Sequence, residues 1–281
     1  MPELPEVETM CRGIRSVVGH SIARVFAPPC PCRPIAMVPT MRTIDRRLRG
    51  QVISRVRRLG KRVVLIAGQH ALVIHPRMTG MVCLNEPPNR DYLRLQMELS
   101  DSAGATLFFW DRRGLGTVEL VPADELDRRI ADQRLGPDAL DIALDQFVAR
   151  LSNSASPIKV VLLDQRRLAG IGNLYASEIL HAAKVHPSRR ACDLKPAHWS
   201  QVYTHMRRIL NEAIAFEGST LSDGTYRNAL NHPGGYQSHH RVYDRAGHRC
   251  FVCRRGRIRR IVQAQRSTFY CPICQPLPRR S

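Results

Sequence analysis

Hydrophobic positions change their spacing twice along the chain. Residues 5–18 place apolar side chains three and four positions apart, with Pro5 suited to a first turn, and predict one amphipathic helix. Short apolar runs bounded by Gly, Pro, Asn and Asp then predict these strands: Gln51–Val56, Arg62–Ala67, Ala71–His75, Tyr92–Leu99, Thr106–Trp110 and Gly116–Leu120. From Ala139 to about Phe216 the spacing is helical again, most clearly in Ile158–Leu163, Asn173–Ala183 and Trp199–Phe216.

Two stretches interrupt this pattern. The segment Leu135-Gly136-Pro137-Asp138 is typical of a linker, because Gly and Pro both interrupt regular structure. Residues 217–240, rich in Gly, Ser, His and Asn, predict a long mobile loop. The tail from Arg241 carries eleven Arg against one acidic residue, Asp244. The pattern therefore predicts a β domain, a helical domain and a basic tail, in that order.

Length and composition exclude two classes of protein. The chain has 281 residues, 43% of them hydrophobic, enough for two domains or for one domain with a small appendage. No stretch approaches the roughly 20 apolar residues of a membrane span. The start, Met1-Pro2-Glu3-Leu4-Pro5-Glu6, lacks the basic beginning and apolar run of a secretion signal. We therefore expect neither a membrane protein nor a secreted disulfide scaffold.

The charge indicates a polyanionic partner. The formal net charge is +19, from 43 Lys and Arg against 24 Asp and Glu. Arg dominates, and its guanidinium is suited to bidentate contacts with the phosphates of nucleic acids. A ribosome-associated or merely basic protein would have the same composition, so charge alone does not choose between these classes.

Four of the nine cysteines form two Cys-x2-Cys pairs, Cys250 with Cys253 and Cys271 with Cys274, separated by 17 residues. This spacing is typical of a zinc ribbon, in which two turns each offer two thiolates to one tetrahedral ion. Disulfide pairing is the alternative, and the missing secretion signal counts against it. We predict one structural Zn²⁺. The remaining thiols are predicted to be buried or incidental.

The first residues offer an amine and two carboxyl groups. If Met1 is removed, Pro2 exposes a secondary amine, and α-amino groups titrate near ~8. Attack of such an amine on an aldehyde-like carbon gives an iminium, which acts as an electron sink. Glu3 and Glu6 lie one turn apart beside it, suited to donating or relaying a proton. The alternative is an ordinary Met-Pro start whose glutamates offset the helix dipole.

Two further segments are candidates for phosphate contact. Gly170-Ile171-Gly172-Asn173 joins two predicted helices; its glycines permit a tight turn, and Asn173 is predicted to cap the second helix. Gln265-Arg266-Ser267-Thr268 precedes the second cysteine pair, where a ribbon hairpin would present Arg266. An ordinary packing corner and a solvated arginine are the respective alternatives.

Three segments together resemble one family. MPELPEVE at 1–8, GIGNLYASE at 170–178 and AQRSTFYCP at 264–272 occur in the same order as in the bacterial formamidopyrimidine-DNA glycosylases, which excise oxidised purines such as 8-oxoguanine. The resemblance covers nearly the whole chain. The first two segments favour this branch over the related endonuclease VIII branch.

The resemblance implies roles for individual residues. Pro2 would attack the sugar C1′ and form the iminium, Glu3 would protonate the ribose ring oxygen, and Glu6 would support this proton traffic. Lys61 would contact phosphate and assist β-elimination, and Arg266 would grip phosphate beside the lesion and serve δ-elimination. The implied DNA contacts are His75 and Asn173 on phosphate, Lys159 near the damaged nucleotide, Arg90, the void-filling Met78 and Arg113, and the wedge Leu115.

Two segments depart from the family pattern. The run His75-Pro76-Arg77-Met78 stands where the family usually has His-Leu-Gly-Met, and residues 111–116, DRRGLG, stand where it usually has Asp-Pro-Arg-Arg-Phe-Gly. Leu115 can intercalate but stacks less well than Phe, so we expect weaker lesion interrogation and an altered opposite-base preference. The cysteine pairs are one residue further apart than usual, a length that a hairpin can absorb.

We therefore predict an α+β fold: an N-terminal helix on a β-sandwich at 1–134, a helix–two-turn–helix domain at 139–236 and a zinc ribbon at 241–281. The predicted function is a bifunctional repair glycosylase and abasic-site lyase for oxidised purines. It would act as a cytoplasmic, nucleoid-associated monomer on double-stranded DNA containing oxidised bases or abasic sites, away from membranes. The alternatives are an oxidised-pyrimidine glycosylase of the same superfamily and a lesion-binding protein with weakened catalysis.

Overall fold

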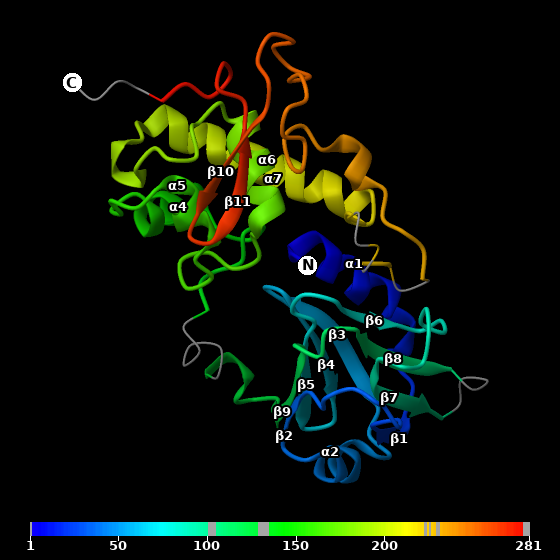
Figure 1. Ribbon diagram of the computed structural model, residues 1–281. Helices are drawn as coiled ribbons and strands as arrows, with labels where there is room; N and C mark the ends of the chain where they lie inside the picture. The colour runs from blue at the N-terminus through cyan, green and yellow to red at the C-terminus, as the bar shows by residue number, and fades with distance from the viewer. Residues whose placement is uncertain are drawn as a thin grey trace. The chain divides into compact units, whose positions relative to one another are not determined.

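The computed structural model describes residues 2–100, 105–128, 135–221, 224, 226–228 and 231–277 (Figure 1). The chain divides into two compact units, each described by itself. Unit 1 comprises residues 1–133 and 213–237, and unit 2 comprises residues 134–212 and 238–281. No helix within the described ranges combines the length and apolar character that a bilayer crossing requires.

Unit 1 consists of two β-sheets and short helices. The helical elements are α1 (Leu4–Gly13), the 3-10 turn η1 (Arg15–Val17) and α2 (Met41–Leu48). One sheet has the order β1 (Ile22–Phe26), β7 (Leu93–Leu99), β8 (Thr106–Asp111) and β6 (Gly80–Cys83). The other has the order β2 (Ala36–Val38), β9 (Thr117–Pro122), β5 (His70–His75), β4 (Arg62–Ala67) and β3 (Ile53–Leu59). Only the β2–β9 pair is parallel among the described strands.

One apolar core joins both sheets to α1. Val7 and Met10 of α1 are buried in the same cluster as Leu65 of β4 and Phe109 of β8. Burying a side chain of this size contributes about 1.5–3 kcal/mol. The core therefore fixes the orientation of α1, whose first turn carries two of the candidate site residues.

Unit 2 consists of helices and one hairpin. The helices are α4 (Leu144–Leu151), α5 (Ile158–Leu163), α6 (Asn173–Ala182) and most of α7 (Pro196–Ala215), with the 3-10 turn η2 (Ala191–Asp193). The 3-10 turn η3 (Tyr236–His239) contains residues of both units. The hairpin pairs β10 (Arg259–Gln263) with β11 (Arg266–Tyr270), and β11 lies against α6 (Figure 1). Val242, Ile258 and Phe269 form a separate small core there.

Most predicted elements are confirmed. The strand over 62–67 and the helix over 158–163 have the predicted bounds, and the others have shifted ends. The single helix over 5–18 is wrong, because α1 ends at Gly13, a poor helix former, and the chain continues as η1. Neither α2 nor β1, β2 and β6 was predicted. A register shift between Ile22 and Arg24 breaks the alternation of β1, and β6 is buried at every position. The described residues of 217–235 form neither helix nor strand.

Candidate functional site

The start of α1 holds two buried carboxylates in a reciprocal arrangement. Glu3, the N-cap, accepts a hydrogen bond from the backbone N–H of Glu6, and Glu6 Oε2 accepts one from the backbone N–H of Glu3 at 2.9 Å. This is a capping box, formed because an acidic residue stands three positions after the cap. The side chains of Glu3 and Glu6 are 3% and 2% exposed, and Pro2 is buried beside them. The structure therefore brings all three residues to one helix end.

A second segment of unit 1 holds Glu6 in place. The N–H of Ser219 donates to Glu6 Oε1 at 2.9 Å. Gly218 has φ +79°, and a Cβ there would lie 2.9 Å from Glu6 Oε1, so only glycine fits. The Tyr226 hydroxyl donates to the carbonyl oxygen of Glu217 at 2.9 Å, and burial raises the pKa of Tyr226 well above its usual value. The two carboxylate oxygens of Glu6 thus hold the backbone N–H groups of Glu3 and Ser219, one oxygen for each.

Lys61 and His75 lie at strand ends of the five-stranded sheet. Gly60 and Lys61 form the two-residue turn between β3 and β4, where Gly60 has φ +55°. His75 ends β5. Burial, followed by the nearby cations Arg77, Arg62 and Lys61, lowers the pKa of His75 to about 3. The imidazole is therefore neutral at pH 7 and offers one N–H donor instead of a positive charge.

The turn between β8 and β9 presents Arg113 and Leu115 to solvent. Beneath it, the fully buried Asp111 accepts a hydrogen bond from the Thr79 hydroxyl at 2.5 Å and another from the N–H of Gly116 at 2.7 Å. The Thr79 hydroxyl accepts the N–H of Arg113 at 3.0 Å. Leu115 remains 46% exposed. The buried carboxylate therefore fixes the backbone while both side chains project from it.

The two departures from the family pattern have opposite effects on backbone strain. Gly114, in place of the usual arginine, has φ +62°, which glycine adopts without strain. Arg94 supports this turn, because its Nε donates to the Asp111 carbonyl oxygen at 2.9 Å. Arg77, in place of the usual glycine, has φ +56°, which costs a side-chain-bearing residue roughly 1–2 kcal/mol. The first departure relieves strain and the second adds it.

Met78 and Arg90 are the remaining predicted DNA contacts of unit 1. Met78 is half-buried directly after Arg77. Arg90 is exposed, and its guanidinium lies 2.5 Å from Glu86 Oε1 in an ion pair that raises the pKa of Arg90. Exposed ion pairs of this kind are weak, so Arg90 can exchange its partner for a phosphate.

In unit 2, Lys159 ties three segments together. Its ammonium donates to Asn173 Oδ1 at 2.6 Å, to Thr268 Oγ1 at 2.7 Å and to the carbonyl oxygen of Ser267 at 3.0 Å. Asn173 Nδ2 also donates to the Ser267 carbonyl oxygen, at 3.0 Å. Lys159 is 0% exposed, and these acceptors match the three donors of an ammonium. Lys159 and Asn173 are therefore brought together, with Lys159 inside the unit.

Arg266 is exposed at the first position of β11. The preceding turn residues, Ala264 and Gln265, both have positive φ, +45° and +59°, as a tight two-residue hairpin turn requires. The next residue, Ser267, is held through its carbonyl oxygen by Lys159. The position of Arg266 is therefore set by the helical part of unit 2.

The residues of α6 have roles that sequence reasoning missed. The predicted cap is wrong: Gly172 is the N-cap, without a side-chain cap hydrogen bond, and Asn173 reaches β11 instead. Glu178, the last residue of the 170–178 segment, is 3% exposed, and its spacing from Gly170 and Asn173 predicts no role for it. Its carboxylate accepts backbone N–H bonds at 2.7–2.9 Å from Arg241, Val242 and Tyr243. Burial raises the pKa of Glu178. Spacing within the motif carries no signal for partners so distant in sequence.

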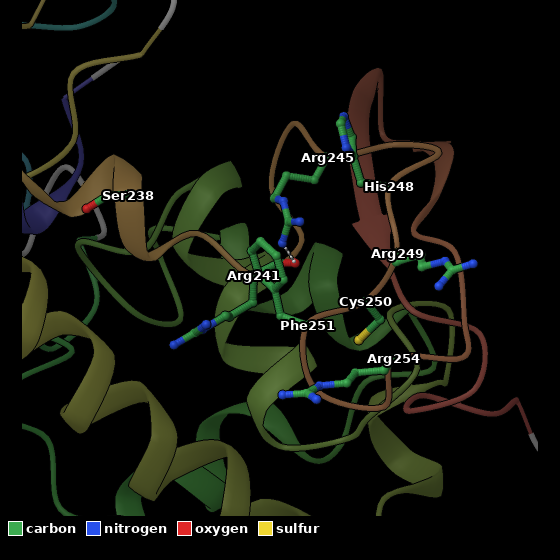
Figure 2. Close-up of a pocket in the computed structure, with 8 residues that line it drawn as sticks. All are labelled: Ser238, Arg241, Arg245, His248, Arg249, Cys250, Phe251 and Arg254. Carbon is green, nitrogen blue, oxygen red and sulfur yellow. Dashed lines mark hydrogen bonds between the residues drawn. The ribbon is translucent and has the colours of Figure 1, made fainter.

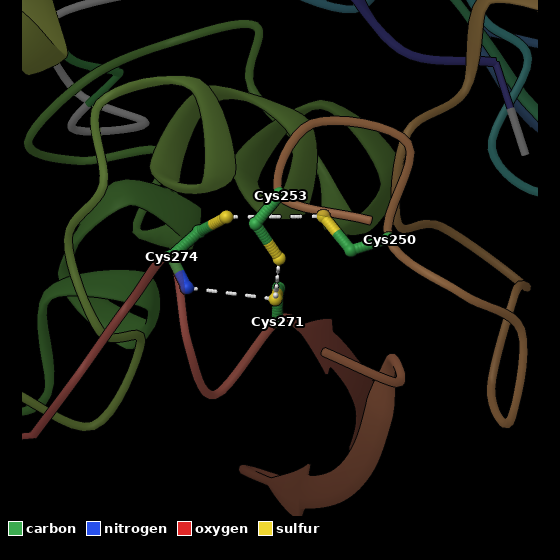
Figure 3. A group of neighbouring side chains, drawn as sticks. All are labelled: Cys250, Cys253, Cys271 and Cys274. Carbon is green, nitrogen blue, oxygen red and sulfur yellow. Dashed lines mark hydrogen bonds between the residues drawn. The ribbon is translucent and has the colours of Figure 1, made fainter. Parts of the chain in front are cut away.

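The four predicted zinc ligands meet at one point (Figure 3). Their Sγ atoms all lie within 4.8 Å of one another, with 3.8 Å between Cys250 and Cys274 and 3.7 Å between Cys253 and Cys271. Zinc–sulfur bonds of ~2.3 Å in a tetrahedron separate the sulfurs by about 3.8 Å. The N–H of Gly256 donates to Cys253 Sγ at 3.3 Å, and this bond, together with that from the N–H of Arg255, lowers the pKa of Cys253 to about 6. Burial raises the pKa of Cys271 and Cys274. All nine cysteines lie in described ranges and are free, so the disulfide alternative is not adopted.

Two family models match the chain, over successive segments. Residues 1–118 match the family model of the formamidopyrimidine-DNA glycosylase N-terminal domain, and residues 135–225 match that of the formamidopyrimidine-DNA glycosylase H2TH domain. The formamidopyrimidine-DNA glycosylases of Chloroflexus aurantiacus and Streptococcus pneumoniae are each 36% identical to the chain, over 98% of its length and 98% and 99% of theirs.

Solved structures show the same likeness. Lactococcus lactis Fpg in complex with DNA containing an abasic site has 29% identity and a TM-score of 0.87. Wild-type L. lactis Fpg with DNA containing N7-benzyl-Fapy-dG has 30% identity and a TM-score of 0.86. Both comparisons cover 98% of this chain and 100% of the other. The likeness therefore extends over both units and the cysteine-rich tail.

Proposed function

Because the chain belongs to the formamidopyrimidine-DNA glycosylase family of base-excision-repair enzymes, we propose that it excises oxidised purines from duplex DNA and then cleaves the strand as an abasic-site lyase. The observation that carries the proposal is the burial of Pro2 beside the Glu3–Glu6 capping box at the start of α1. A nucleophilic amine and a proton donor there lie on the same rigid helix end.

In this mechanism Pro2 acts once Met1 has been removed. The lone pair of its nitrogen forms a bond to the sugar C1′ while the bond from C1′ to the base breaks, and the proton that the nitrogen then loses neutralises the departing base. Glu3 delivers a proton to the ribose ring oxygen as the ring opens, and the product is an iminium. Glu6 keeps Glu3 and Ser219 in place through their backbone N–H groups.

Strand scission then follows by elimination. The iminium withdraws electrons, so a proton is lost from C2′ and the bond from C3′ to its phosphate oxygen breaks; a second elimination breaks the bond at C5′. Lys61, at a hairpin tip, and Arg266, at the start of β11, are the cations proposed for the two phosphates. His75 and Asn173 would donate hydrogen bonds to neighbouring phosphates.

The target nucleotide must leave the duplex before Pro2 can reach its sugar, at a cost of a few kcal/mol. Arg113 and Leu115 project from a turn fixed by a buried carboxylate, so they can fill the space in the base stack at little further cost in ordering. Met78 would help to fill the same space, and Arg90 would contact the DNA backbone. Lys159 would position Asn173 and the Arg266 hairpin.

The sulfur geometry fits one structural zinc ion, held by Cys250, Cys253, Cys271 and Cys274. When bound, Zn²⁺ supplies a crosslink between the loop before β10 and the turn after β11, which keeps the hairpin and its Arg266 rigid. The proposed partner of the whole chain is duplex DNA with an oxidised purine or an abasic site, and we propose that a monomer binds it.

Borohydride trapping on an abasic-site duplex tests the proposal. Wild-type protein is expected to form a covalent adduct, because borohydride reduces the iminium to a stable amine. A form that keeps an N-terminal tag ahead of Pro2 is expected to form none, because its proline nitrogen is an amide. The matched control is Arg113→Ala, which leaves the amine intact and is expected to retain the adduct.

Three outcomes separate the alternatives. An equal adduct yield with the tagged form overturns the role of Pro2. Lesion binding without any adduct supports the binding protein with weakened catalysis. Faster excision from thymine glycol duplexes than from 8-oxoguanine duplexes supports the oxidised-pyrimidine glycosylase.

A further inference from the structure

The loop that leads into the β10–β11 hairpin forms an open pocket of about 800 Å³ with a strongly basic lining (Figure 2). Its walls include Arg241, Arg245, Arg249 and Arg254, together with His248 and Phe251. Within the described part of the chain, none of these four arginines forms an ion pair with a carboxylate. The pocket therefore concentrates positive charge. The buried carboxylate of Glu178 acts electrostatically on Arg241 and Arg245, but it accepts backbone N–H bonds and forms no ion pair with either guanidinium.

An aromatic ring organises the centre of this pocket. The guanidinium carbon of Arg245 lies 3.3 Å from the centroid of the Phe251 ring, and that of Arg241 lies 6.0 Å from it. Arg245 Nη1 also donates to the carbonyl oxygen of Arg241 at 3.0 Å. A guanidinium stacked on a ring keeps the donors along its edge directed outward, so less freedom is lost when an anion binds.

The pocket and Arg266 belong to opposite ends of the hairpin. Strand pairing places Arg259 opposite Tyr270 at the cysteine end and Gln263 opposite Arg266 at the turn. The four residue steps from Arg259 to Gln263, at ~3.3 Å each, separate these ends by about 13 Å along the strand. The pocket includes Cys250, before β10, and Figure 1 shows this loop at the end away from the turn. It is therefore a different surface from the proposed lesion-side contact.

Neutralising a zinc site does not account for the charge. Four thiolates and Zn²⁺ leave about two net negative charges, which two arginines would balance. The pocket has four arginines, and their heads do not converge: in Figure 2, Arg241 and Arg254 reach toward the left of the view and Arg249 toward the right. A spread of this kind suits several anions in a row better than one compact anion.

We propose that this pocket binds backbone phosphates of the DNA duplex outside the lesion, as a second phosphate-binding site. The inference rests on the proposed function for its ligand. Arginines on successive parts of one loop match a strand that carries a phosphate at every nucleotide. The site would lengthen the footprint on undamaged DNA and leave the chemistry at Pro2 unchanged.

The test uses the triple variant Arg241→Gln, Arg249→Gln, Arg254→Gln in the zinc-loaded full chain. Binding is measured against salt with two duplexes that carry the same uncleavable abasic-site analogue, one of about one helical turn (~10 base pairs) and one of about three turns (~30 base pairs). On the long duplex, the slope of log K against log salt is expected to fall by about 2.7, because each phosphate that the variant no longer neutralises contributes ~0.9 to the slope. On the short duplex, affinity is expected to match wild type. The borohydride adduct yield, measured on a separate short duplex with a natural abasic site, is also expected to match wild type.

The matched control is Arg42→Gln, Arg46→Gln, Arg47→Gln, which removes the same charge from exposed positions in α2. An equal loss of slope in both triple variants overturns the proposal, because net charge alone then explains it. A loss on the short duplex also overturns it, since the pocket would then belong to the lesion site. Tripolyphosphate binding that the pocket variant loses, with long-duplex binding unchanged, assigns the pocket to small polyphosphates instead. Loss of trapping in wild type would count against Pro2, not the pocket.

Discussion

The two units use buried charge at a helix start in opposite ways. At α1, Glu3 and Glu6 are buried and accept hydrogen bonds from backbone N–H groups. At α6, Lys159 is buried and donates to oxygens of Asn173 and β11. A carboxyl group can serve as a proton donor or acceptor in a reaction, whereas an ammonium with three acceptors is committed to its contacts. The comparison supports our proposal that the start of α1 carries the chemistry and that the start of α6 positions the hairpin.

Metal removal is expected to have the largest effect, and to act through unit 2. Chelation should release the four cysteine thiolates and unfold the tail from Arg241, because structural zinc contributes ~10–16 kcal/mol in small finger modules. Duplex binding, measured by fluorescence anisotropy, should be abolished. In a Trp199→Phe background, Trp110 of unit 1 is the only tryptophan. An emission spectrum that chelation leaves unchanged would therefore show that unit 1 stays folded and that the damage is confined to unit 2. Full duplex affinity after complete metal removal would contradict the zinc assignment.

Glu3→Gln tests the chemical side of the comparison. The amide still accepts a hydrogen bond but cannot deliver a proton, so single-turnover base excision should fall by about 10²–10⁴. Lesion-duplex affinity should stay within a few-fold. Glu8→Gln, in the same helix, removes the same charge from an ion pair with Arg12 and serves as the control. Excision at the wild-type rate in Glu3→Gln would remove Glu3 as the proton donor.

Lys159→Met tests the positioning side. The variant leaves buried oxygens of Asn173 and Thr268 without this donor, so the free energy of unfolding should fall by about 1–3 kcal/mol. Duplex affinity should weaken while the excision rate of bound lesion is retained, because Arg266 loses its fixed position. Lys195→Met, at an exposed site of the same unit, is the control. A fall in excision rate at constant affinity would place Lys159 in the chemistry instead.

Elements and clusters defined by local spacing could be predicted from the sequence, whereas long-range contacts could not. The four-cysteine cluster and the helix at α5 follow from repeats of a few residues. The ends of α1 and the strand β1 were missed because a glycine and a register shift interrupt the pattern. The burial of Lys159 depends on Thr268, 109 positions away. The three domains at 1–134, 139–236 and 241–281 stay a prediction.

The pH dependence of stability provides a finer test within unit 1. The pKa of His75 is about 3 in the folded chain, and that of an unfolded histidine is about 6.5. As pH falls below about 6.5, the unfolded chain binds a proton that the folded chain does not, so stability decreases down to about pH 3. His75→Gln should therefore lose less thermal stability than wild type between pH 7 and pH 5, as measured by calorimetry. His70→Gln, at the other end of β5, controls for damage to the sheet. Parallel curves of stability against pH for His75→Gln and wild type would contradict the lowered pKa of His75.

Leu115→Phe is expected to have the smallest effect. The side chain is 46% exposed on a turn already fixed by Asp111, so stability should not change. A phenyl ring stacks on bases better than a branched aliphatic chain, and base–aromatic stacking contributes about 1–3 kcal/mol per base. The ratio of lesion to undamaged duplex affinity should rise a few-fold, and Leu115→Ala should lower it. An unchanged ratio in both variants would show that discrimination comes from Arg113 or Met78, and that Leu115 does not act as the wedge.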